Sequence, residues 1–99
     1  MKANLETLKK ALQLCAKAHK VEFCDWSDEE QLAIKSEDTP VVNDMRMILD
    51  AFFGYRNYDL SVEWGYCNVF LNDEYLDNVN EMSLNFALPS GWTRELVES

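Results

Sequence analysis

The sequence predicts one acidic α+β domain over residues 1–99, with N-terminal helices packed on one face of an antiparallel β-meander of three to four strands. The chain has 99 residues, 47% of them hydrophobic and 12% aromatic, which suffices for one packed core but not for two. Helical spacing of apolar residues dominates the first half, and two-residue alternation dominates residues 58–86. Only three glycines and two prolines interrupt these patterns.

Residues 5–19 form the first predicted helix, because one stripe of side chains recurs every three or four positions. Asn4 is suited to cap its start. Such a helix is expected to pack its stripe on the domain's own sheet. The alternative is a two-heptad seam that joins two copies of the chain. The stripe consists of Leu5, Leu8, Leu12, Cys15 and His19.

The next segment has two interpretations after a short predicted strand at residues 21–26. Ser27 and Glu30 have the spacing of a capping box, and acidic residues crowd the turn that would follow. We therefore predict a short helix from Asp28 to Lys35. The alternative is a strand through Leu32 and Ile34, because Leu-Ala-Ile-Lys also alternates weakly.

Thr39 and Pro40 open the most clearly marked helix, which is predicted to run to Phe53. Thr39 is the expected N-cap, and a proline at the first helical position sacrifices no useful hydrogen bond. Gly54 supplies a left-handed stop. The wide apolar face makes this helix the predicted centre of the core; it consists of Val41, Val42, Met45, Ile48, Leu49, Phe52 and Phe53.

Alternation of apolar and polar residues predicts the strands of the C-terminal half. Two strands are expected at residues 58–64 and 66–71, separated by Gly65, and two shorter ones at residues 75–76 and 82–86. A last helical turn is expected at residues 92–97. The predicted core, shared by the second helix and these strands, is Met45, Leu49, Phe52, Leu60, Val62, Val69, Leu84 and Phe86.

The chain is strongly acidic, with 18 acidic and 9 basic residues and a net charge of −9. The charge comes in blocks: +4 in residues 1–20, −6 in residues 21–38, 0 in residues 39–56 and −7 in residues 57–99. A surface of this sign repels phosphates, so we expect no direct binding to nucleic acid and none to an anionic membrane.

The sequence predicts a cytoplasmic protein with reduced, mostly buried thiols. Lysines interrupt every apolar run before residue 20, and no run of 18 apolar residues exists. Cys15, Cys24 and Cys67 are an odd number without a paired framework.

Residues that could carry chemistry are few. Cys15, His19, Cys24 and Cys67 include zinc-ligand types but lack the spacing of a knuckle. A Cys15–His19 pair could act as nucleophile and base, but no glycine-rich turn is available for an oxyanion hole. We therefore predict no enzyme activity, no catalytic residue, no metal and no cofactor. A small Cys- or metal-dependent enzyme is the weakest alternative.

Acidic residues gather at the start of the predicted short helix, Asp28-Glu29-Glu30, and at a predicted turn, Asp73-Glu74 with Asp77. A solvated face is the simplest explanation, and the spacing fits no calcium loop. The alternative is a recognition surface, because carboxylates can occupy an Arg and Lys groove built for phosphates. Aromatic residues beside such acids are typical of interface anchors. The predicted partner-binding residues are Glu22, Asp25, Trp26, Asp28, Glu29, Glu30, Asp73, Glu74, Tyr75 and Asp77.

The chain resembles anti-CRISPR proteins, anti-restriction proteins and the immunity partners of nuclease toxins in class, though no stretch carries a family signature. The shared features are a length near one hundred residues, strong acidity, α+β folding and no catalytic motif. The likeness implies a phage or bacterial inhibitor whose partner is a basic nucleic-acid-processing protein. The alternative is an intracellular adaptor or a homodimer held by the N-terminal helix, with charge that serves solubility.

Overall fold

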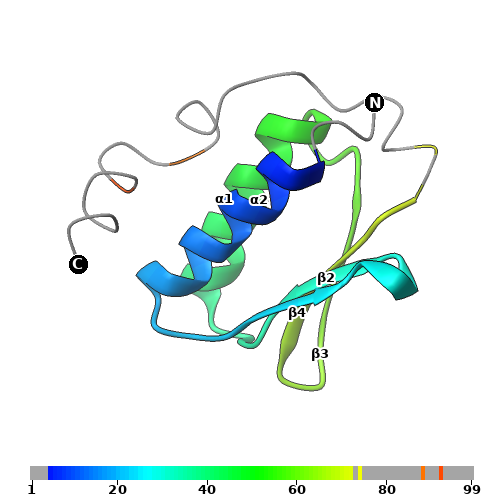
Figure 1. The fold of residues 1–99 in the computed structure, drawn as a ribbon. Helices are drawn as coiled ribbons and strands as arrows, with labels where there is room; N and C mark the ends of the chain where they lie inside the picture. The colour runs from blue at the N-terminus through cyan, green and yellow to red at the C-terminus, as the bar shows by residue number, and fades with distance from the viewer. Residues whose placement is uncertain (1–4, 73, 75–87, 89–91, 93–99) are drawn as a thin grey trace.

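Two helices and two β-hairpins alternate along the chain in the computed structural model, which describes residues 5–72, 74, 88 and 92 (Figure 1). Each hairpin follows one helix, so the order is helix, hairpin, helix, hairpin. The elements are α1 (Leu5–Ala18), β1 (Phe23–Trp26), the 3-10 turn η2 (Ser27–Glu29), β2 (Gln31–Ile34), α2 (Thr39–Phe53), β3 (Asp59–Glu63) and β4 (Tyr66–Phe70).

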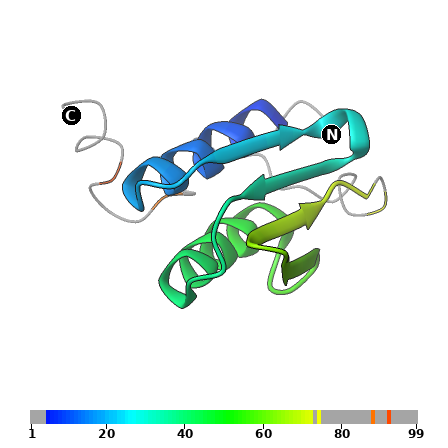
Figure 2. The ribbon, with the colours of Figure 1, turned by 90° about the horizontal axis from the view of Figure 1, so that it is seen from below.

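The four strands form one antiparallel sheet in the order β1-β2-β4-β3. The two hairpins join along β2 and β4, where Leu32 pairs with Val69 and Ile34 with Cys67. Both helices lie side by side on one face of the sheet, and Figure 2 shows the strands crossing in front of them. The predicted α+β class, with N-terminal helices on one face of an antiparallel sheet, is confirmed.

The helix predicted from Asp28 to Lys35 is wrong, and the alternative strand is the one that forms. Ser27–Glu29 make a single 3-10 turn, and Glu30 ends it in the left-handed region at φ 59°. No side chain caps this turn, so the predicted capping box does not form. A strand forms here in place of the predicted helix because β2 lies inside the sheet, where its apolar side chains are buried on both faces. Two strands therefore precede α2, and the strand order is not that of a sequential meander.

The ends of α2 follow the sequence closely, with two corrections. Thr39 is the first helical residue, and Asp38 takes the N-cap position without a side-chain cap hydrogen bond. The helix ends before Gly54 as predicted, and the Gly54 N–H donates to the Asp50 carbonyl at 2.9 Å. The predicted left-handed conformation is wrong, because Gly54 has φ of 91° but ψ of 157°.

The core lies between the helices and the sheet. Leu8, Leu12 and Cys15 of the α1 stripe are buried there and Leu5 and His19 are half-buried, so α1 packs on its own domain as predicted. Leu88 and Trp92 also pack against this core. The largest fully buried side chains are Leu8, Leu12, Leu32, Ile34, Met45, Ile48, Leu49, Phe52 and Val69.

The predicted core residues divide into three groups. Met45, Leu49, Phe52 and Val69 are confirmed as fully buried, and Leu60 is half-buried. The prediction that Val62 belongs to the core is wrong. Its side chain is 39% exposed, because β3 is an edge strand. Leu84 and Phe86 lie outside the described residues, as do the strands predicted at 75–76 and 82–86 and the turn after Trp92.

Replacing Trp64 by Asn is expected to raise the free energy of unfolding by about 0.5–1 kcal/mol. Trp64 and Gly65 form the β3–β4 turn with φ of 58° and 82°, a backbone that favours Asn-Gly. The Trp64 side chain is 89% exposed, so little packing is lost. Urea denaturation measures the change. Trp64→Ala removes the ring without relieving the backbone, and equal stability of the two variants would contradict the argument.

Candidate functional site

Among the described residues, the helices and the sheet carry net charges of opposite sign. The sheet layer, residues 21–35 and 59–72, holds seven acidic residues and one lysine, a net charge of −6. The helix layer, residues 5–20 and 39–56, holds three acidic and six basic residues, a net charge of +3. Within these described residues, the charge blocks of the sequence thus become two layers of opposite net charge.

The sheet has one face against the helices and one face turned away from them, which we call the open face (Figure 2). Successive side chains of a strand point to opposite faces. Because Leu32, Ile34, Cys67 and Val69 enter the core, the residues that alternate with them occupy the open face. These open-face residues are Cys24, Trp26, Gln31, Ala33, Asp59, Ser61, Glu63, Tyr66, Asn68 and Phe70, placed by the strand register.

Two aromatic rings meet on the open face. The ring centroids of Trp26 and Tyr66 lie 5.2 Å apart, although the two residues are on different hairpins. Their contact bridges the register row of Ala33 and Asn68, and both of those residues are buried despite facing away from the helices. The β2–β4 register creates this contact, so it cannot be read from either hairpin alone.

Side-chain amides form hydrogen bonds in the middle of the open face. The Gln31 side-chain amide donates to Asn68 Oδ1 at 2.8 Å. The Asn68 amide in turn donates to the Ser61 carbonyl at 3.2 Å. These bonds tie β2, β4 and β3 together and hold the surface rigid between the aromatic rings.

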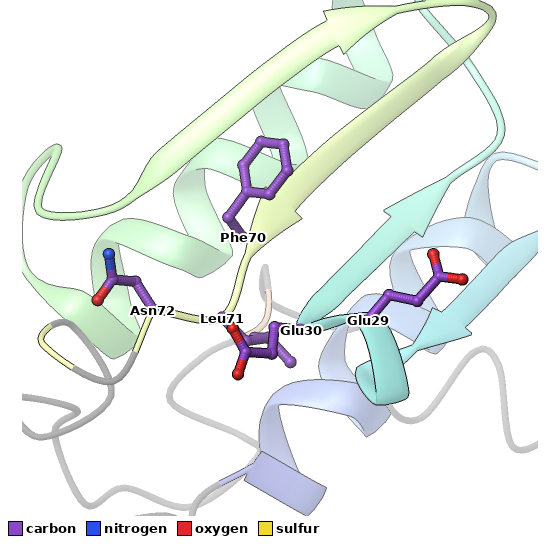
Figure 3. Close-up of a pocket in the computed structure, with 5 residues that line it drawn as sticks. All are labelled: Glu29, Glu30, Phe70, Leu71 and Asn72. Carbon is purple, nitrogen blue, oxygen red and sulfur yellow. The ribbon is translucent and has the colours of Figure 1, made fainter.

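The acidic turn at Asp28-Glu29-Glu30 lies against the end of β4. The Leu71 N–H donates to the Glu30 carbonyl at 2.7 Å and anchors the turn there. A pocket of about 340 Å³ lies between them, lined by Glu29, Glu30, Phe70, Leu71 and Asn72 (Figure 3). Figure 3 also shows Phe70 in front of β4, on the side away from α2.

Two further acidic residues neighbour residues that line this pocket. Asp59 pairs directly with Phe70, and Glu74 donates its N–H to Asn72 Oδ1 at 2.9 Å. We call this group the acidic end; it comprises Asp28, Glu29, Glu30, Asp59 and Glu74. Asp59, Tyr66 and Phe70 were not among the predicted site residues. For Tyr66 and Phe70 a signal was available, because they alternate with the apolar residues Cys67 and Val69, which are buried, and so lie on the other face of the strand.

Asp25 pairs with a lysine of α1 instead of occupying the open face. Its register partner is Leu32, so it faces the helices, where its carboxylate lies 3.3 Å from Lys9 Nζ. Desolvation favours protonation, but hydrogen bonds from Ser27 and Lys9 outweigh it and lower the pKa of Asp25. Asp25 therefore fixes the start of the acidic turn to α1.

The other predicted partner-binding residues are dispersed. Trp26 lies on the open face, as described above. Glu22 lies at the opposite end of β1, where its carbonyl accepts the Lys35 N–H at 2.8 Å. Asp73, Tyr75 and Asp77 lie outside the described residues. The structure thus places Asp28, Glu29 and Glu30 on one turn, with Glu30 beside the same pocket as Asn72, whose side chain accepts the Glu74 N–H. Glu22 lies apart from them.

The cysteines and the histidine are arranged for packing. His19 Nε2 lies 2.7 Å from Asp44 Oδ2, and the His19 ring meets the Trp92 ring edge-on. Cys15 is buried, and burial, with Asp44 and Cys67 nearby, raises the pKa of its thiol to about 12. A nucleophilic cysteine needs the opposite shift. No group of three His, Cys, Asp or Glu residues within the described ranges could hold a metal ion.

Of the three free thiols, only that of Cys24 is expected to react with an alkylating reagent in the native protein near pH 8. Cys15 and Cys67 are fully buried, and burial raises the pKa of Cys67 to about 11. Mass spectrometry should count one label in buffer and three in denaturant. Cys24→Ser should remove the native label, whereas equal labelling of all three thiols would contradict the buried placement.

The same thiols give stability a pH dependence. The folded pKa of Cys15 is about 12, against 9.0 for an unperturbed thiol, so the unfolded chain ionises first. The free energy of unfolding is therefore expected to fall as pH rises from about 9 towards 12. Cys15→Ala should flatten this part of the profile, and an unchanged slope would assign it to other groups.

Among the residues described, no helix is long and apolar enough to cross a membrane. Comparison of the chain with known protein families, curated proteins and solved structures finds no match.

Proposed function

We propose that this protein is an acidic recognition module that occupies the basic nucleic-acid-binding site of another protein and inhibits it. The observation that supports this most directly is the separation of charge into a sheet layer of −6 and a helix layer of +3. The proposed targets are a nuclease, a restriction enzyme or a CRISPR-type complex, in phage anti-defence or toxin immunity.

The acidic end is held in a defined geometry, as a substitute for a row of phosphates requires. The hydrogen bond from Leu71 fixes Glu30 to β4, and the ion pair of Lys9 with Asp25 fixes the preceding strand to α1. A turn whose backbone is fixed before binding loses less conformational entropy when its carboxylates meet arginine and lysine side chains.

The positive charge of the helix layer helps to orient the molecule as it approaches a basic partner. A molecule with opposite charges on two sides turns its negative side towards a basic target before contact. Such steering raises association rates and weakens as salt screens the charges.

A homodimer held by α1 is less well supported, because Leu8, Leu12 and Cys15 of its apolar stripe are buried in the core of the same chain. The structure offers no specific observation in favour of an adaptor role.

Competition with nucleic acid tests the proposal. The immobilised protein is incubated with host lysate at low salt, and proteins eluted by high salt are identified by mass spectrometry. Each purified candidate is then bound to its DNA or RNA, and this protein is added in a gel-shift titration. Displacement of the nucleic acid is expected. Candidates that keep their nucleic acid at saturating inhibitor would overturn the proposal.

A further inference from the structure

We propose that the open face of the sheet, together with the pocket beside Phe70, is the docking surface, and that its occupant is an arginine-bearing segment of the basic partner. This inference rests on the proposed function and names the surface and the side chain it recognises. It predicts contacts with aromatic rings as well as with carboxylates.

The pocket combines the two groups that recognise a guanidinium. The Phe70 side chain is 38% exposed and borders the same pocket as Glu29 and Glu30. A planar guanidinium stacks on an aromatic ring and also pairs with a carboxylate through two parallel hydrogen bonds. Figure 3 shows both carboxylates and the ring on neighbouring segments, with Asn72 on the other side of Phe70.

The surface continues from the pocket across the sheet. Gln31 lies between Trp26 and Phe70 in one register row, and the ring of Tyr66 meets that of Trp26. An apolar and aromatic strip therefore runs beside the acidic end. Such a surface suits the long, weakly hydrated arginine side chain better than the compact ammonium of lysine.

The negative charge of the sheet layer disfavours a second copy of the chain as the occupant of the open face. Two open faces brought together would oppose two sheet layers of −6 each. Facing layers of like charge repel, whereas a segment rich in arginine neutralises the carboxylates of the acidic end. The complementary partner is therefore cationic.

Two peptides of equal charge, hexa-arginine and hexa-lysine, separate stacking from simple attraction. The ¹⁵N-labelled protein is titrated with each, and the three indole N–H signals are assigned by single Trp→Phe changes. Hexa-arginine is expected to shift the Trp26 signal. The signals of Trp64, at the hairpin tip, and of Trp92, against His19, are internal controls that should stay in place.

Variants then test the pocket. Phe70→Ala is expected to weaken hexa-arginine binding about five-fold and to leave hexa-lysine binding unchanged. Trp64→Ala, which removes an exposed ring away from the open face, is the matched control and should leave both unchanged. The NMR spectrum of each variant confirms that it is folded.

The outcomes are distinguishable. If both peptides bind equally, lose affinity with salt and leave the Trp26 signal in place, the arginine site is wrong and the acidic recognition role stands. If neither peptide binds, both the proposed function and the proposed arginine site are wrong. If the Trp26 signal moves on dilution of the protein alone, a second copy covers the face and the proposed occupant is wrong.

Discussion

Phe52→Ala is expected to lower the free energy of unfolding by about 3–5 kcal/mol, a large share of the stability of a small domain. Phe52 lies on α2, is fully buried and is the largest of the fully buried side chains. Its removal would leave a cavity between the helices and the sheet, and the packed neighbours can fill only part of it. Urea denaturation at constant pH measures the difference.

Two further variants keep this result interpretable. Phe52→Leu should cost about 1–2 kcal/mol and stays measurable if the alanine variant does not fold. Met47→Ala lies on the same helix with 52% of its side chain exposed, so its cost should stay within about 0.5 kcal/mol. Similar losses for Phe52→Ala and Met47→Ala would show that the core is not where the structure places it.

Reversing Asp28, Glu29 and Glu30 together to lysine is expected to slow association with a basic partner about ten-fold or more at low salt. The three exposed carboxylates lie on one turn at the acidic end, and their reversal changes the net charge from −9 to −3. The dependence of the rate on salt should weaken in parallel. Surface plasmon resonance against a competing target identified by gel shift gives both quantities.

Stability should change little in this triple variant. Exposed charges contribute little to folding, and the turn has no side-chain cap that the reversal could remove. The matched control reverses Glu6, Glu37 and Asp38, which changes the net charge equally but at places outside the strands of the sheet and outside the acidic end. If both triple variants bind alike, total charge rather than the acidic end governs association. If neither binds differently from the native protein, the charge-based proposal fails.

The helices were predictable because their signals are local. In α1 the apolar spacing, and in α2 the proline, the apolar face and Gly54, all lie within one segment of chain. The hairpin strands β3 and β4 were predictable for the same reason, since alternation and a turn glycine lie side by side.

Residues 28–35 could not be decided in this way. Over four residues a helical and a strand pattern look alike, and Leu32, Ala33 and Ile34 are all buried in β2. What selects the strand is its place between β1 and β4, with the helices on one face and the rings of Trp26 and Tyr66 on the other. That environment is built by residues from both hairpins and both helices.

By itself the sequence determined the α+β class, the two helices, the net charge of −9 and the clustering of acids at the Asp28–Glu30 turn. Only the tertiary structure decided which of those charges share a surface. The pairing of β2 with β4 brings Glu30 to Leu71 and Trp26 to Tyr66, about 40 residues apart in the chain. Local patterns determine the elements, whereas strand register, set by burial of one face of every strand at once, determines which side chains meet.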